Sequence, residues 1–125
     1  FSPDDLYQNG MILEKGYYNN QYSILMQSNR ALTDSDLIWR ANVNGTLYDF
    51  VKIKSSAFVR RGWNYVAGTF TSGAQSMYLN GQLMGTNKIT GIIAEPPTGI
   101  TIAASGTISG TVLTRTYYFE GRIGI

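Results

Sequence analysis

Residues 63–85 decide the fold: Trp-Asn-Tyr-Val-Ala-Gly-Thr-Phe, then Thr-Ser-Gly-Ala-Gln-Ser, then Met-Tyr-Leu-Asn-Gly-Gln-Leu-Met-Gly. The first segment is rich in aromatic and β-branched residues, which favour a strand, and a small turn cluster follows it. Asn80-Gly81 lies between two apolar runs and is typical of a β-hairpin turn. Bulky residues fall on both faces of the strand that starts at Trp63, which favours a central position in its sheet.

The hairpin at Asn80-Gly81 has two possible loops. A two-residue type I′ turn makes Leu79 and Gln82 the first pair, whereas a four-residue loop starts the pairing at Tyr78 and Leu83. Both loops satisfy the pairing rules, so the sequence leaves the alternative open.

Residues 63–85 resemble the concanavalin A-like lectin/glucanase superfamily, and laminin G-like domains in particular, which carry Trp-x-x-Val-Ala followed by Tyr-x-Asp/Asn-Gly. Ile12–Gly16 with Tyr22–Leu25 resembles the early strand pair of that family. Tyr118–Ile125 resembles its closing Phe-x-Gly-x-Ile strand. The resemblance implies a carbohydrate-binding or adhesion domain, and it implies that the family's first and last strands are missing here.

The composition is that of an all-β domain. The chain has 125 residues, 43% of them hydrophobic and 14% charged, and no segment keeps a helical period for three turns. We therefore expect an antiparallel β-sandwich of jelly-roll type, built from about ten short strands. Residues 1–125 are expected to form a single domain, which can be an excerpt of a longer chain because the first residue is not Met.

Several classes of function are disfavoured by what the sequence lacks. There is no Cys and no His, which removes disulfides, thiolate or histidine metal sites, and catalysis by Ser-His-Asp or Cys-His groups. The net charge is only +2, and the basic residues are scattered, so no nucleic-acid partner is expected. No apolar run has the length of a membrane span, so no membrane insertion is expected.

The loop Tyr17-Tyr18-Asn19-Asn20 is the first candidate for binding a ligand. Aromatic rings stack on the apolar face of a pyranose, and amides bind hydroxyl groups both as donors and as acceptors. A structural alternative is that one tyrosine packs on the sheet while the asparagines adopt turn geometry. The prediction is a glycan site on this loop.

Asp34 and Asp36 are the candidate metal ligands. Two carboxylates at i and i+2 are the minimum of a calcium site with oxygen ligands, although a third acid is missing. The ordinary alternatives are turn hydrogen bonds and an ion pair with Arg30. Calcium is thus the one cofactor that the sequence suggests.

A second hairpin is predicted over residues 37–54, with its turn at Asn44-Gly45. Trp39 lies in its first strand and is expected in the core. If side chains alternate regularly along the second strand, Asp49 falls on the same face as apolar residues. Either the strand therefore has a bulge or Asp49 has a charged partner.

Three functions follow from these features. The first is a non-catalytic carbohydrate-binding or adhesion module on an extracellular, cell or virion surface, with a glycan or glycoprotein as its partner. The second is an assembly domain, in which a protein partner or a further chain segment covers the terminal strand edges at Ile123 and Ile125. The third is a glycoside hydrolase. It is disfavoured because no Glu-x-Asp-x-x-Glu run, the pattern of the family's glucanases, is present.

Overall fold

The structure is a computed structural model, and it describes most of the chain. The described residues are 1–3, 9–17, 20–28, 35–59, 61–71, 73–93, 99–102, 105–109, 112–116, 118–119 and 121–124. This part of the chain contains no helix with the length and apolar character needed to cross a lipid bilayer.

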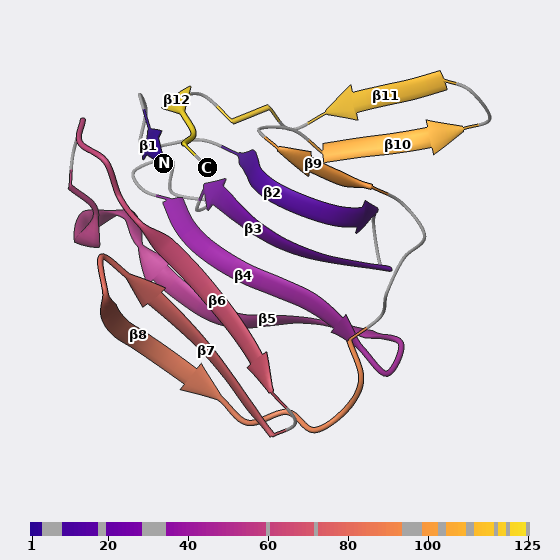
Figure 1. Ribbon diagram of the computed structural model, residues 1–125, viewed down its shortest axis with the longest axis horizontal. Coiled ribbons are helices and arrows are strands. Elements are labelled where there is room, and N and C mark those ends of the chain that lie inside the picture. Colours follow the sequence, from indigo (N-terminus) through magenta and orange to yellow (C-terminus); the bar gives the residue numbers. More distant parts are fainter. Residues whose placement is uncertain are drawn as a thin grey trace.

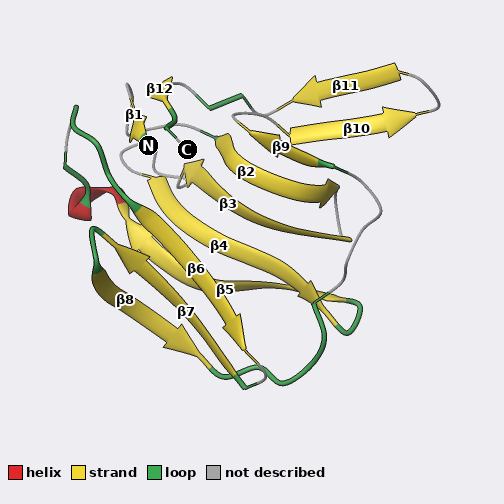
Figure 2. Ribbon diagram, viewed as in Figure 1, coloured by secondary structure: helices red, strands yellow, loops and turns green. Residues whose placement is uncertain are grey.

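Almost all the regular structure is β (Figures 1 and 2). The strands are β1 (Ser2–Pro3), β2 (Gly10–Tyr17), β3 (Asn20–Ser28), β4 (Ser35–Val43), β5 (Thr46–Lys54), β6 (Val66–Thr71), β7 (Ala74–Leu79), β8 (Gln82–Asn87), β9 (Ile100–Ile102), β10 (Ser105–Ser109), β11 (Val112–Thr116) and β12 (Gly121–Arg122). A 3₁₀ turn, η1 (Ser55–Ala57), follows β5.

The larger sheet has five strands in the order β5-β4-β3-β2-β9, and every pairing is antiparallel. Alternation along β4 separates its two faces: Leu37 and Trp39 point into the main core, whereas Ile38 joins a small cluster with Met11 and Leu25 on the outward face. Period-2 alternation is what a strand imposes on its side chains. The prediction that Trp39 belongs to the core is confirmed, since it is 6% exposed.

The smaller sheet has three strands in the order β6-β7-β8. Its β7–β8 hairpin has the two-residue turn, with Leu79 paired to Gln82 and positive φ at Asn80 (53°) and Gly81 (81°). Both residues therefore adopt the type I′ conformation for which Asn-Gly is suited. A bulge then follows, because Met77 pairs with Gly85 instead of Met84.

The two sheets pack face to face, and two glycines show which strands meet. A Cβ at Gly68 of β6 would lie 3.0 Å from the Trp39 ring of β4, and one at Gly85 of β8 would lie 3.0 Å from Val51 of β5. Thus β6 meets β4 and β8 meets β5 across the core. Buried Met77 and Leu79 of β7 complete the core between the sheets.

The β4–β5 ladder contains a bulge that resolves the question raised by Asp49. Trp39 pairs with Val51, but the next residue, Arg40, pairs with Asp49, so Phe50 is skipped. Phe50 and Val51 both reach the core as a result, and Asp49 points to the outward face beside Arg40. The sequence offered a bulge and a charged partner as alternatives for Asp49, and the structure has both.

Short strands close the molecule near the two chain ends. Ser2 pairs with Arg122 and Pro3 with Gly121, so β1 and β12 form a two-stranded ladder beside the labelled termini in Figure 1. Phe1, the residue before β1, packs edge-to-face on Phe58 and Phe119. The β10–β11 hairpin contacts β2 and β9.

One expectation about the smaller sheet is wrong. The stretch that begins at Trp63 was expected to be a central strand, but β6 begins at Val66 and is an edge of its sheet in the described structure. Trp63 (56% exposed) and Tyr65 (69%) lie before it and face solvent. Apart from this point, the architecture is the antiparallel β-sandwich that the sequence predicts.

Candidate functional site

The predicted glycan loop lies at one end of the larger sheet. Tyr17 ends β2 and Asn20 begins β3, and the two residues pair with each other across the hairpin. Their side chains, and Tyr18 and Asn19 altogether, lie outside the described residues. The structure therefore places the loop within the fold without testing which of its side chains could contact a ligand.

The β4–β5 turn lies at the same end of the sheet, because Val43 pairs with Thr46 there. Asn44 (φ 51°) and Gly45 (φ 84°) form the turn, and the Gly45 N–H donates to Asn42 Oδ1 at 2.9 Å. Asn42 is itself 5% exposed. This side-chain bond holds the turn in the left-handed conformation that its two residues tolerate.

Residues 88–93 connect the smaller sheet to this turn, and Asn44 holds them in place. The Ile92 N–H donates to Asn44 Oδ1 (3.1 Å), and the Asn44 N–H donates back to the Ile92 carbonyl (3.2 Å). A Cβ at Gly91 (φ 155°) would collide with the Asn44 amide and with Val43. Glycine is therefore required for this close approach.

Gln75 holds the same segment from the inside. Its side chain is fully buried at 0% exposure, yet all its polar atoms are bonded. The Ile89 N–H donates to Oε1 (2.8 Å), and Nε2 donates to the carbonyls of Ile89 (2.5 Å) and Thr71 (3.3 Å). A buried amide that satisfies both backbone polar groups of one residue fixes the chain at that residue.

The loop end therefore combines a fixed backbone with exposed surface. Asn44, Gly45, Thr46 and Thr90 are exposed, and Ile92 is 80% exposed beside them. Exposed amide, hydroxyl and carbonyl groups on a preorganised scaffold can bind a polar ligand without a large ordering cost. This arrangement suits recognition of a hydroxyl-rich molecule.

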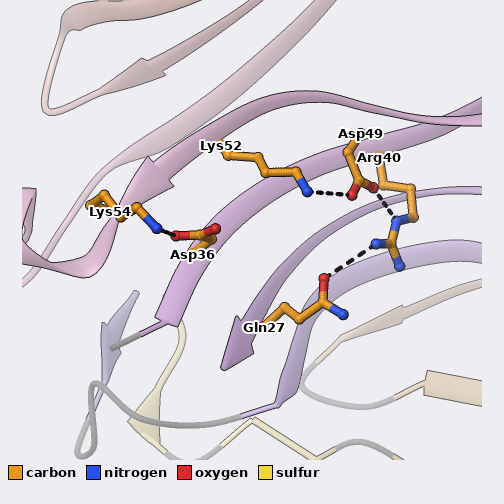
Figure 3. A network of polar contacts seen from close by, with 6 residues as sticks. All are labelled: Gln27, Asp36, Arg40, Asp49, Lys52 and Lys54. Atoms are coloured by element: carbon orange, nitrogen blue, oxygen red, sulfur yellow. Dashed lines mark hydrogen bonds and ion pairs between the residues drawn. The ribbon is translucent and has the colours of Figure 1, made fainter. Parts of the chain in front are cut away.

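A separate network of charges covers the outward face of the larger sheet (Figure 3). Its first pair joins Lys54 Nζ to Asp36 Oδ1 at 2.6 Å, across the β4–β5 ladder. The Asp36 carboxylate is thus bound to an ammonium group, and Arg30, the partner considered from sequence, lies outside the described residues.

Asp49 is the centre of the second part of this network. Its Oδ1 accepts from Arg40 Nε at 2.5 Å and its Oδ2 lies 3.0 Å from Lys52 Nζ, while Arg40 also reaches Gln27 Oε1 at 3.4 Å. Burial acts to raise the pKa of Asp49, but the hydrogen bonds and charges of Arg40 and Lys52 outweigh it and hold that pKa below its ordinary value. Asp49 is consequently a fixed carboxylate near neutral pH.

The predicted calcium ligands are not brought together by the described residues. Asp34 lies outside them, and Asp36 is paired with Lys54. No group of three acidic residues that could hold a metal occurs in the described ranges. In the described structure the Asp36 carboxylate is engaged by an ammonium group, and the calcium pair Asp34 and Asp36 stays a prediction.

The sequence reasoning missed the two residues that organise the loop end. Asn44 was predicted as a turn residue, and that local signal gave no sign of its bonds to residues 90 and 92. Gln75 lies in a polar turn cluster, where burial is not expected. Its partner is 14 residues away, so no local pattern reveals it.

A laminin G family model, described as the Concanavalin A-like lectin/glucanases superfamily, matches residues 1–124 of the chain. The search of curated proteins and the search of solved structures found no match to this chain.

Proposed function

Because the chain belongs to the concanavalin A-like lectin/glucanase superfamily, we propose that it is a non-catalytic carbohydrate-binding or adhesion module. The family match over nearly the whole chain is the observation that carries this proposal. The ligand is a glycan or glycoprotein, and the domain works on an extracellular, cell or virion surface.

The proposed site is the loop end formed by the β2–β3 hairpin, the β4–β5 turn and residues 88–93. Tyr17 and Tyr18 supply the stacking surfaces for a sugar ring, and Asn19 and Asn20 bind its hydroxyl groups. The support from the structure is the scaffold next to this hairpin, which Asn44 and Gln75 hold by side-chain hydrogen bonds. Preorganisation of this kind lowers the entropy cost of binding a flexible glycan.

The absence of catalysis is part of the proposal. Glycoside hydrolysis needs one carboxylic acid that can donate a proton and a second carboxylate across the scissile bond. Among the described acids, Asp36 and Asp49 are each bound by cations, and Asp49 has a lowered pKa. A carboxylate of that kind is unsuited to act as a general acid.

The test is a glycan-array screen of the domain, with Tyr18→Ala as the loop variant. Tyr65→Ala is the matched control, because Tyr65 is exposed and lies at the opposite end of the sandwich beside the Asn80 turn. We expect binding that Tyr18→Ala weakens by about tenfold or more and Tyr65→Ala leaves unchanged. Absence of binding by a folded domain, or an equal loss in both variants, would contradict the proposal.

A calcium requirement at Asp34 and Asp36 is tested by repeating the screen with calcium and with a chelator. Since Lys54 already binds Asp36, we expect glycan binding to be unchanged by the chelator. A chelator-dependent loss that Asp36→Asn reproduces would instead establish a calcium site in which Asp36 leaves Lys54.

An assembly domain is the second candidate, and one observation favours it. Large apolar side chains remain exposed, among them Ile92 (80%), Ile100 (58%) and Ile102 (42%). Groups of exposed apolar residues commonly mark contacts with other proteins. Sedimentation analysis over a hundredfold range of concentration would show self-association if these residues bind a second copy.

A further inference from the structure

Tyr48 is an aromatic residue near the loop end that stays exposed although it lies on the inner face of the larger sheet. It pairs with Ala41 of β4, whose side chain belongs to the main core, and paired residues share one face of a sheet. Tyr48 is nevertheless 36% exposed. Its strand, β5, is an edge of the sheet in the described structure, so the ring lies at the margin of the core.

Other aromatic rings hold the Tyr48 ring from the side of the core. It is nearly parallel to the Phe50 ring, with 7° between the planes and 6.2 Å between the centroids. Phe50 is buried, and its ring lies 5.0 Å from that of Trp39 and 5.9 Å from that of Phe70. A row of rings thus runs from the core to the surface and ends in Tyr48. Because the Tyr48 ring is already ordered, a ligand that stacks on it meets little additional entropy cost.

Polar groups that can bind a sugar lie beside this ring. Thr46 precedes Tyr48 by two residues on the same strand, so the two side chains share a face and their backbones are about 7 Å apart. Thr46 is exposed and pairs with Val43 at the β4–β5 turn. Tyr48 adds its own hydroxyl group. A flat ring with hydroxyl groups next to it provides the two kinds of contact that a pyranose makes.

The surface between Tyr48 and the turn is uncharged. Residues 44–46 and 90–92 include no acidic or basic side chain. Asp49, the neighbour of Tyr48, lies on the outward face, where Arg40 and Lys52 bind its carboxylate. Amide, hydroxyl and backbone groups without a net charge suit a neutral sugar better than a charged ligand.

Tyr48 is too far from the β2–β3 hairpin for one sugar to contact both. The strands follow each other in the order β5-β4-β3-β2, and β2 and β4 end on the same side of the sheet (Figure 1). With neighbouring strands about 4.8 Å apart, β5 lies about 10 Å from β3 and about 15 Å from β2. A single pyranose ring is shorter than either distance, so only a chain of sugars reaches from the hairpin to Tyr48.

We propose that the loop end binds a chain of neutral sugars instead of a single terminal sugar, and that Tyr48 is its second stacking residue. This inference rests on the proposed function, which assigns the first stacking contacts to Tyr17 and Tyr18. The sugar chain crosses the β4–β5 turn, where hydrogen bonds to Gly45 and Asn44 fix the backbone. Its rings stack on tyrosines at both ends, and the hydroxyl groups between them meet the polar groups of the turn.

The test measures how the affinity depends on the length of the sugar chain. The probes are neutral homo-oligosaccharides of glucose, mannose, xylose and N-acetylglucosamine, each in lengths of one to six sugars, first on an array and then by titration calorimetry. The wild type is compared with Tyr48→Leu, Tyr48→Phe, Tyr18→Ala and the control Tyr65→Ala. Leucine keeps an apolar contact with Phe50 and removes the flat ring, whereas phenylalanine keeps the ring.

We expect the wild type to bind the longest members of a series about tenfold or more tightly than the single sugar. Tyr48→Leu should lose this gain and bind the short members as the wild type does, which also shows that the variant is folded. Tyr48→Phe should keep most of the gain, and Tyr65→Ala all of it. Tyr18→Ala should weaken binding at every length.

Failure of this inference differs from failure of the proposed function. Binding that Tyr18→Ala weakens, but that neither grows with chain length nor responds to Tyr48→Leu, would overturn the inference and leave the proposed function standing. An equal loss at every length in Tyr48→Leu would also overturn it, because Tyr48 would then act on the structure of the whole site. If the folded domain binds no member of any series, both fail.

Discussion

Replacing Gln75 by Leu removes the buried amide that holds residues 88–93 and keeps the side-chain volume nearly constant. Three hydrogen bonds are lost, two of them to the N–H and carbonyl of Ile89. A net hydrogen bond contributes about 1 kcal/mol, and a buried polar group left without a partner costs about 1–3 kcal/mol. Thr71 is exposed, so water can replace its bond. Ile89 is half-buried, so its two groups account for most of the loss.

We therefore expect Gln75→Leu to lower the free energy of unfolding by about 2–3 kcal/mol, measured by urea denaturation. The matched control is Gln82→Leu, because Gln82 is exposed on β8 and should change stability by less than about 0.5 kcal/mol. Amide exchange at Ile89 should accelerate in the first variant alone. A loss below about 0.5 kcal/mol together with unchanged Ile89 exchange would refute the role assigned to Gln75.

Three further predictions follow from the core and from the outward sheet face. Asp49→Asn should lower stability by about 1 kcal/mol at pH 7. Because the folded pKa of Asp49 is lowered, its contribution is present above about pH 4 and is lost as pH falls through the folded pKa, so urea denaturation should show a smaller difference between the two proteins in acid than at pH 7. Gly68→Ala should cost about 1–2 kcal/mol and alter the near-UV circular dichroism of Trp39, while Gly99→Ala, which meets nothing within 4 Å, should do neither. Ser23→Ala should raise the melting temperature, because the buried Ser23 hydroxyl has no hydrogen-bond partner among the described residues, and a decrease would show that the hydroxyl is satisfied in solution.

The sequence predicted the hairpins well because their signals are local. Asn44-Gly45 and Asn80-Gly81 each form a two-residue turn with positive φ at both positions, which at Asn80-Gly81 decides between the two loops that the sequence left open. Trp39 was correctly placed in the core from its position in an apolar strand. Asp49 was recognised as an exception to alternation, and the bulge with its Arg40 partner explains why.

Features that depend on distant residues were not predictable in the same way. Bulk on both faces suggested a central strand from Trp63 onward, but Trp63 and Tyr65 lie before β6 and remain exposed. Whether a strand is central depends on its neighbours, which the strand's own residues do not encode. The burial of Gln75 likewise depends on Ile89 beyond the next hairpin. The glycan loop was located by residue type alone, and its side chains remain predictions.

The pairing of the chain ends has a consequence for how the protein folds. Phe1 bonds to Asn64 across 63 positions, and β1 pairs with β12 from the other end of the sequence. Contacts between such distant segments carry a large loop-closure entropy and slow the folding of β proteins. The hairpins β4–β5 and β7–β8 can form early from local signals, whereas the β1–β12 ladder can form only after Gly121 and Arg122 have been synthesised. During synthesis on the ribosome, the aromatic cluster of Phe1, Phe58 and Phe119 therefore stays open until Phe119 has emerged, and chaperones would have access to it for that interval.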